Sequence, residues 1–137
     1  MNFEQKVELI RRAYGALAKD DLEYIHPEVE LRDPTRPDSQ NPSGVWRGHD
    51  GMRRSDAEWR ESFEEFDFSL QEFVPVGEMV AVRARASGRA RASEIVLENE
   101  RFHLIGFRDG RISSIENCAD LAAAQAAAER AASRPVD

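Results

Sequence analysis

The sequence of 137 residues contains a single cysteine and no long apolar run. Cys118 has no partner for an intramolecular disulfide, which fits a reducing compartment, and a lone thiol in a strand normally serves packing. No segment approaches the roughly 20 apolar residues that a membrane-spanning helix needs. The first residues, MNFEQKVELIRRAY, alternate charged with apolar side chains and lack the apolar region of a signal peptide. We therefore expect a cytoplasmic protein.

Basic residues are also few, 19 against 26 acidic ones, and the formal net charge is -7. A nucleic acid or an anionic membrane would need a concentrated basic face to displace its counterions, so the composition disfavours both partners. The histidines are His26, His49 and His103. They form no pair at metal-ligand spacing and have no cysteine partner, so we expect no metal site. His26, which precedes Pro27, is typical of a loop, and His49, which precedes Asp50, is typical of a helix start.

The length predicts one domain, residues 1–137, with one core. Apolar residues recur at helical spacing over residues 3–17, where Asn2 and Gln5 suit a capping box. Asp20 and Glu23 repeat that arrangement and predict a second, very short helix, which must end at the sequence HPE. After a proline-rich loop, residues 50–66 predict another amphipathic helix with Asp50 as its N-cap and an apolar stripe of Met52, Trp59, Phe63 and Phe66.

The rest of the chain is mostly of strand type. Residues 29–33 alternate apolar with polar side chains, and residues 66–119 predict four consecutive strands with a hairpin turn at RDG. Arginines of the second of these strands and glutamates of the third should form cross-strand ion pairs on a solvated face. Asp120 can cap an alanine-rich helix that covers the domain or a partner subunit, and residues 129–137 should be a frayed tail.

Strand parity selects two candidate catalytic residues. Asp33 shares a strand face with Val29 and Leu31, and burial in an apolar space would make it a usable base near neutral pH. The alternative is that an aspartate before proline ends the strand by bonding loop amides. His103 shares a face with Ile105 and should point into an apolar space, where a neutral imidazole could donate a hydrogen bond or accept a proton. The alternative is a histidine that merely satisfies the core.

Aromatic side chains could line a cavity suited to a flat hydrophobic ligand, or could equally fill the core. They are Trp46, Trp59, Phe63 and Phe107.

Four motifs occur in order along nearly the whole chain: YGALAKDDLE, HPEVELRDP, RGHDGMRR and HLIGFRDGRI. In this order the sequence resembles the SnoaL-like branch of the nuclear transport factor 2-like superfamily. The resemblance implies an α+β fold, a cone-shaped and mostly antiparallel sheet wrapped around N-terminal helices (a cystatin-like roll), with a C-terminal helix. It also implies a pocket at the open end of the cone and a homodimer. Because the superfamily includes isomerases, cyclases, hydrolases and members that only bind, the fold leaves the function open.

The resemblance also bears on single residues. Asp33 falls where ketosteroid isomerases keep their proton-shuttling aspartate, and His103 where they carry a hydrogen-bond-donating acid. Their oxyanion tyrosine aligns with Ala13 rather than Tyr14, so Tyr14 should pack in the core with its hydroxyl on a polar neighbour. Asn117 replaces the final-strand aspartate of SnoaL-type cyclases, and an amide can orient a ligand but cannot shuttle a proton.

Two functions follow from these residues. One is an enzyme without cofactor that acts on a small hydrophobic carbonyl compound, in which Asp33 moves a proton and His103 polarises an oxygen. The other is a non-catalytic ligand-binding or homodimeric accessory module. Tyr14 and Asn117, with the aromatic residues, are the candidate ligand contacts in either case.

Overall fold

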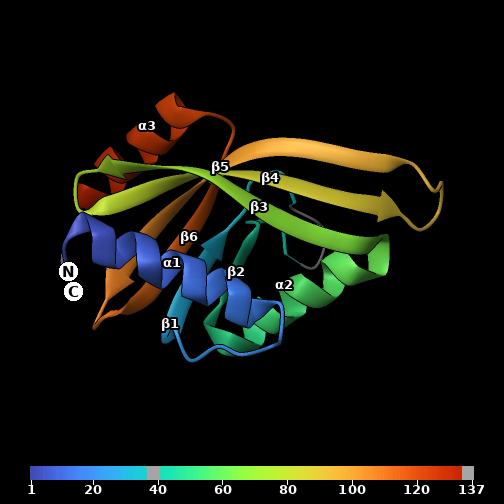
Figure 1. Ribbon diagram of the computed structural model, residues 1–137, viewed down its shortest axis with the longest axis horizontal. Coiled ribbons are helices and arrows are strands. Elements are labelled where there is room, and N and C mark those ends of the chain that lie inside the picture. The colour runs from blue at the N-terminus through green and yellow to red at the C-terminus, as the bar shows by residue number, and fades with distance from the viewer. Residues whose placement is uncertain (37–40, 134–137) are drawn as a thin grey trace.

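The computed structural model describes residues 1–36 and 41–133. Within these residues it has three helices packed on one curved, unclosed sheet (Figure 1). The predicted α+β class and curved sheet are confirmed. The six strands follow the order β2-β1-β6-β5-β4-β3, and all neighbours are antiparallel except β1 and β6. The elements are α1 (Phe3–Leu17), β1 (Ile25–Arg32), β2 (Val45–Arg47), α2 (Gly48–Ser62), β3 (Phe63–Val76), β4 (Met79–Ala90), β5 (Val96–Arg108), β6 (Arg111–Cys118) and α3 (Leu121–Ala132).

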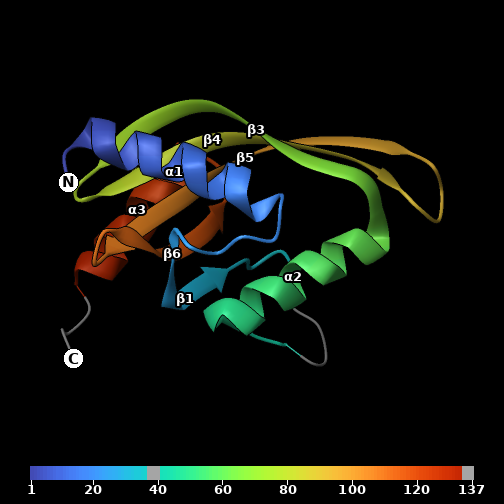
Figure 2. The ribbon, with the colours of Figure 1, turned by 60° about the horizontal axis from the view of Figure 1, so that its bottom comes forward.

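The sheet separates two apolar clusters. Helix α1 crosses one face of the sheet and α3 lies on the opposite face, while α2 lies below α1 near β1 and β2 (Figures 1 and 2). The larger cluster, on the α1 side, includes Ile10, Val29 and Ile105, all fully buried. The smaller one joins α3 to the back of the sheet through Leu104 and Ala124. Both faces of the central strands are therefore covered.

Helix α1 begins at the predicted capping box, in which Asn2 and Gln5 bond each other's backbone N–H. The predicted second short helix is wrong. Asp20 takes a left-handed conformation with φ 57°, and the backbone N–H of Asp21 bonds the carbonyl of Ala16 across it. This pattern closes the end of a helix instead of starting a new one. The segment after α1 is a turn that leads into β1.

Helix α2 also ends earlier than its apolar stripe predicts. Ser62 is its last residue, and Phe63 already pairs with Ala90 in the β3–β4 ladder, so Phe63 and Phe66 are strand residues. Backbone pairing in the hairpin replaces the helical hydrogen bonds, although both rings still pack near Trp59. The N-cap is Arg47, not Asp50, which lies in the first turn where its charge suits the helix dipole.

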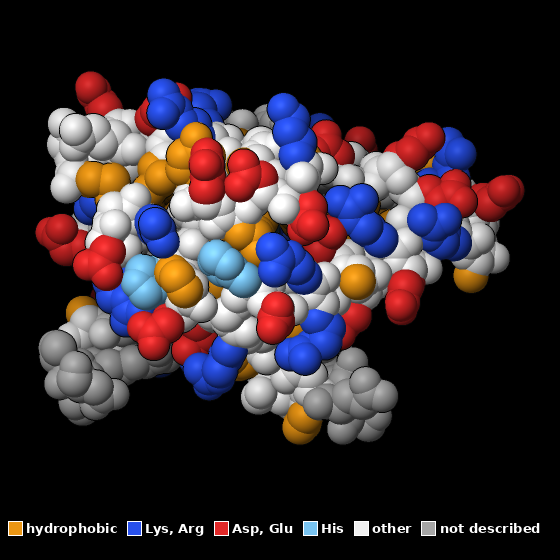
Figure 3. Space-filling view, turned by 90° about the horizontal axis from the view of Figure 1, so that it is seen from below, with side chains coloured by type: hydrophobic (Ala, Val, Ile, Leu, Met, Phe, Trp, Pro, Cys, Tyr) orange, Lys and Arg blue, Asp and Glu red, His pale blue; other side chains and the backbone are white. Residues whose placement is uncertain are grey.

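The predicted meander is confirmed, since β3, β4, β5 and β6 pair consecutively. The predicted pairing of a β4 arginine with a β5 glutamate occurs at Arg83, which lies 3.1 Å from Glu100. Two further pairs involve glutamates of β3: Arg83 lies 3.4 Å from Glu72, and Arg91, just after β4, lies 3.1 Å from Glu64. Positive and negative side chains are likewise interspersed on the face seen in Figure 3.

Helix α3 packs on its own domain. The Asp120 carboxylate accepts from the N–H of Ala123 at 2.8 Å, and the buried Ala124 and Ala127 contact the sheet. The helix continues to Ala132, further than the expected fraying from residue 129, and the remainder of the predicted tail, residues 134–137, lies outside the described residues. Each helix within the described ranges falls short of the length and apolarity needed to cross a bilayer.

Candidate functional site

A cavity of about 650 Å³ lies between α1, α2 and the concave face of the sheet. Its floor follows the strand register. His103 on β5 pairs with Asn117 on β6, and Asp33 comes one residue beyond the last paired position of β1, Arg32 with Glu116. The next inward-facing position of β5, toward the open end, is Arg101. The apolar part of the lining includes Leu17, Leu31, Leu70, Ala84, Ala86 and Ile115.

Tyr14 and His103 form the polar centre of this cavity. The Tyr14 hydroxyl lies 2.6 Å from Nδ1 of His103, and the two rings are stacked with centroids 5.9 Å apart. Phe68 packs edge-on against both rings, at 6.2 Å and 5.1 Å between centroids. Tyr14 thus packs in the core with its hydroxyl on a polar neighbour, as expected, and that neighbour is the candidate catalytic imidazole.

Burial determines the protonation of the pair. It lowers the pKa of His103 to about 4, with Arg101 acting in the same direction and Asp33 opposing both. Burial also raises the pKa of Tyr14. At neutral pH the imidazole is therefore uncharged and the phenol protonated, so the pair holds two polar hydrogens and uses one between Oη and Nδ1. Either Tyr14 donates and the Nε2–H of His103 stays free, or Nδ1–H donates and the Tyr14 O–H stays free. Both arrangements leave one donor for a ligand.

Asp33 is 4% exposed and lines the same cavity. One carboxylate oxygen, Oδ1, accepts from the backbone N–H of Thr35 at 3.0 Å and from its hydroxyl at 2.6 Å. Within residues 1–36 and 41–133, Oδ2 makes no hydrogen bond. The alternative in which Asp33 bonds loop amides is therefore correct for Oδ1, while Oδ2 remains available to a ligand or a water.

Asn117 and Arg101 complete the polar floor. Nε of Arg101 donates to the Asn117 side-chain oxygen at 2.9 Å, and both residues line the cavity. The sequence-based reasoning missed Arg101, although it stands two residues before His103 and so has the same strand parity. It also missed Phe68, for which the alternation of β3 was the available signal.

The four aromatic candidates separate into two groups. Trp59 lines the cavity, whereas Trp46, Phe63 and Phe107 are not among the lining residues. Trp46 is fully buried, Phe63 packs 5.3 Å from Trp59 between ring centroids, and Phe107 packs against the larger apolar cluster. Trp46 and Phe107 therefore agree with the core-filling alternative, whereas Phe63 is half-buried and packs on Trp59 outside both apolar clusters.

A further cationic residue, Arg36, was also missed. Its guanidinium lies 4.5 Å from the ring centroids of both Trp46 and Trp59. It also bonds the hydroxyl of Ser55 and pairs with Glu58 at 3.2 Å. The position of Arg36 in the proline-rich loop gave no periodic signal, so only the folded structure identifies it.

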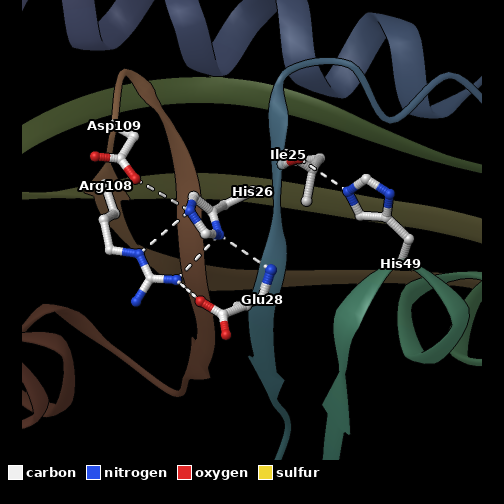
Figure 4. Close-up of polar contacts among 6 residues, drawn as sticks. All are labelled: Ile25, His26, Glu28, His49, Arg108 and Asp109. Carbon is white, nitrogen blue, oxygen red and sulfur yellow. Dashed lines mark hydrogen bonds and ion pairs between the residues drawn. The ribbon is translucent and has the colours of Figure 1, made fainter. Parts of the chain in front are cut away.

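The other two histidines are not among the residues that line the cavity, and Figure 4 shows their polar contacts. His26 contacts Asp109 at 3.3 Å and Arg108 at 3.1 Å, which ties the β5–β6 hairpin to β1. His49 bonds the carbonyl of Ile25 at 2.9 Å and joins α2 to the same strand. Among the described residues no cluster of three or more His, Cys, Asp or Glu side chains could hold a metal.

A family model for the SnoaL-like domain matches residues 10–115, most of the chain. The chain belongs to the SnoaL-like domain family. Solved structures of similar fold include TerC co-crystallised with polyporic acid, with a TM-score of 0.69 and 21% identity over 87% of this chain and 94% of TerC. A comparison with curated protein sequences gives no match.

Two further solved structures similar in fold to this SnoaL-like protein are of proteins described as putative cyclases. IdmH from Streptomyces antibioticus, a putative polyketide cyclase, has a TM-score of 0.68 and 24% identity over 90% of this chain and 97% of IdmH. A putative SnoaL-like polyketide cyclase from Jannaschia sp. CCS1 has a TM-score of 0.69 and 16% identity over 96% and 94% of the two chains. At these identities the likeness establishes the fold, which agrees with the resemblance seen in the sequence.

Proposed function

We propose that this protein binds a small hydrophobic carbonyl compound in the cavity and moves a proton on the carbon beside the carbonyl, without a cofactor. Isomerases and cyclases both use this step. One observation carries the proposal: a buried carboxylate, Asp33, and a neutral hydrogen-bonded pair, Tyr14 and His103, line the same cavity of about 650 Å³. Volumes of this order are typical of small-molecule sites.

The groups divide the chemistry between them. The Asp33 carboxylate takes the proton from the carbon, and the electrons of that C–H bond move to the carbonyl oxygen, which becomes an enolate. The free donor of the Tyr14–His103 pair bonds that oxygen, where negative charge develops. Asp33 then returns the proton to a different carbon, which is an isomerisation. In a cyclisation the enolate carbon instead attacks a second carbonyl carbon of the same molecule, and Asp33 protonates the resulting alkoxide.

The first prediction concerns this proton transfer. With 2-tetralone in D₂O, the wild-type protein should speed exchange of the hydrogens beside the carbonyl, followed by proton NMR. Asp33→Asn should slow the protein-dependent exchange about 100-fold or more, because an amide cannot accept the proton. Asp109→Asn, which changes an exposed hairpin carboxylate, should leave the rate unchanged. Equal rates in wild type and a folded Asp33→Asn variant would retire the assignment.

A second function, binding without turnover, is favoured by Asn117, because an amide cannot carry a proton. For this function 2-tetralone should raise the melting temperature of the protein without any exchange, since a ligand of the native state stabilises it by mass action. The homodimer implied by the resemblance belongs to the same accessory role and is tested by sedimentation velocity.

A further inference from the structure

Arg101 places a positive charge in the cavity next to the Tyr14–His103 pair. It stands on β5 two residues from His103, on the same face, and is partly buried. Its Nε donates to Asn117, and in the described part of the chain its two terminal nitrogens make no hydrogen bond and meet no carboxylate. A guanidinium presents a planar fork of donors, so this fork is available to a ligand.

The other arginines of the cavity wall are already engaged. Arg60 pairs with Asp56 at 2.7 Å, and Arg53 lies 3.6 Å from Asp20. Arg11 lies over the ring of Phe73, 4.6 Å from its centroid. Arg36, as described above, is held by two tryptophans and Glu58. Among the described lining arginines, Arg101 is thus the one whose charge faces neither a carboxylate nor an aromatic ring.

We propose that Arg101 anchors a carboxylate of the ligand, so that the cavity takes carboxylate-bearing aromatic or alicyclic carbonyl compounds. The proposal deepens the proposed function and rests on it for the presence of a ligand in the cavity. A carboxylate pairs with a guanidinium through two parallel charge-assisted hydrogen bonds, which fix orientation as well as add affinity. The pairing also supplies the counter-charge that Arg101 lacks.

The arrangement of the floor orients such a ligand. Asp33 lies two strands from β5, about 10 Å by normal strand spacing, and Arg101 lies about 7 Å along β5 from His103. The Asp33 carboxylate repels an anion, so the ligand carboxylate is favoured at the Arg101 end. The carbonyl then lies near His103 and the carbon beside it toward Asp33. Arg101 is a positioning and specificity residue in this scheme.

The test uses two probes that differ in charge but hardly in shape, 2-naphthoate and 2-naphthamide. In both probes the ring carbon attached to the carbonyl bears no hydrogen, so binding is measured without turnover. By calorimetry the wild type should bind naphthoate about tenfold or more tighter than the amide, as expected for a charge-assisted pair. Arg101→Met should abolish the preference, Arg101→Lys should retain part of it, and Arg85→Met, an exposed site on β4, should leave it unchanged.

Equal affinity of the wild type for both probes would overturn the role of Arg101 while leaving a ligand cavity in place. Failure of 2-naphthoate to bind would overturn the carboxylate proposal, and the exchange of 2-tetralone would still decide the proposed function. If Arg101→Met does not fold, as judged by circular dichroism, the comparison rests on Arg101→Lys. A preference unchanged in a folded Arg101→Met variant would assign the selectivity to another cation.

Discussion

At the scale of single residues, Tyr14 and His103 act as one unit. Their hydrogen bond of 2.6 Å is shielded by Phe68, and burial keeps the imidazole neutral and the phenol protonated. A neutral donor is useful for an enolate because it does not lose its proton to bulk water as the pH changes. Neither residue alone offers this, since each determines where the other's hydrogen points.

Removing the Tyr14 hydroxyl should therefore lower the free energy of unfolding as well as disturb the hydrogen-bond donor of the proposed reaction. Tyr14→Phe leaves Nδ1 of a 7% exposed imidazole without its partner, and we expect a loss of about 1–3 kcal/mol in the free energy of unfolding, measured with urea. Tyr24→Phe, at a half-buried tyrosine outside the cavity, should change it by less than about 0.5 kcal/mol. An unchanged midpoint for Tyr14→Phe would contradict the bond.

At the scale of elements, the loop after β1 holds Asp33 in place. The backbone N–H of Asp33 bonds the carbonyl of Gly44 at 2.8 Å, so the two ends of the loop meet beside the candidate base. Gly44 has φ +65°, and a Cβ there would lie 2.4 Å from the carbonyl oxygen of Asp33. Only glycine allows both this conformation and this approach.

Gly44→Ala should for that reason displace Asp33 as well as strain the loop. We expect a loss of more than about 1 kcal/mol in stability together with reduced 2-tetralone exchange. Gly77→Ala is the matched control, because Gly77 has a similar φ of +61° but no atom within 4 Å of the added Cβ. It should show the conformational cost without loss of exchange. Equal effects of the two variants would show that the close approach to Asp33 is unimportant.

At the scale of the whole molecule, the buried neutral histidine makes global stability depend on pH. The pKa of His103 falls from 6.5 to about 4 on folding, so between these values the unfolded chain binds a proton that the folded protein excludes. The free energy of unfolding therefore decreases as the pH falls through this window. Above the window His103 is neutral in both states and causes no further change with pH. Because both apolar clusters pack on the same sheet, this loss in the free energy of unfolding applies to the whole domain.

This dependence can be measured by urea unfolding at neutral pH and near pH 5. His103 should account for a decrease of about 2 kcal/mol between them. Because carboxylates also titrate, the useful quantity is the difference between wild type and His103→Gln, which should lack that part of the decrease. His49→Gln, at a half-buried histidine outside the cavity, should behave as wild type. An identical decrease in wild type and His103→Gln would refute the burial argument.

Periodicity predicted the parts of the fold whose pattern is local. The capping box at Asn2, the alternation around Asp33 and the RDG hairpin each carry their signal within a few residues. The short helix after α1 and the end of α2 were wrong because hydrogen bonds decide them: the turn at Asp20 closes α1, and Phe63 pairs with Ala90 across a hairpin. Strand parity placed Asp33 and His103 on one cavity, whereas the Tyr14–His103 bond joins residues 89 apart and had no sequence signal.

The open sheet ends in two strands that differ in how they face solvent. At one end β2 has three residues, and at the other β3 has fourteen and, among the described strands, pairs with β4 alone. A strand that long exposes a row of free backbone groups on which a second chain could extend the sheet. Two register shifts interrupt β3, and Glu64, Asp67 and Pro75 break its outer edge with charge and a missing donor. These features protect the long edge against edge-to-edge polymerisation.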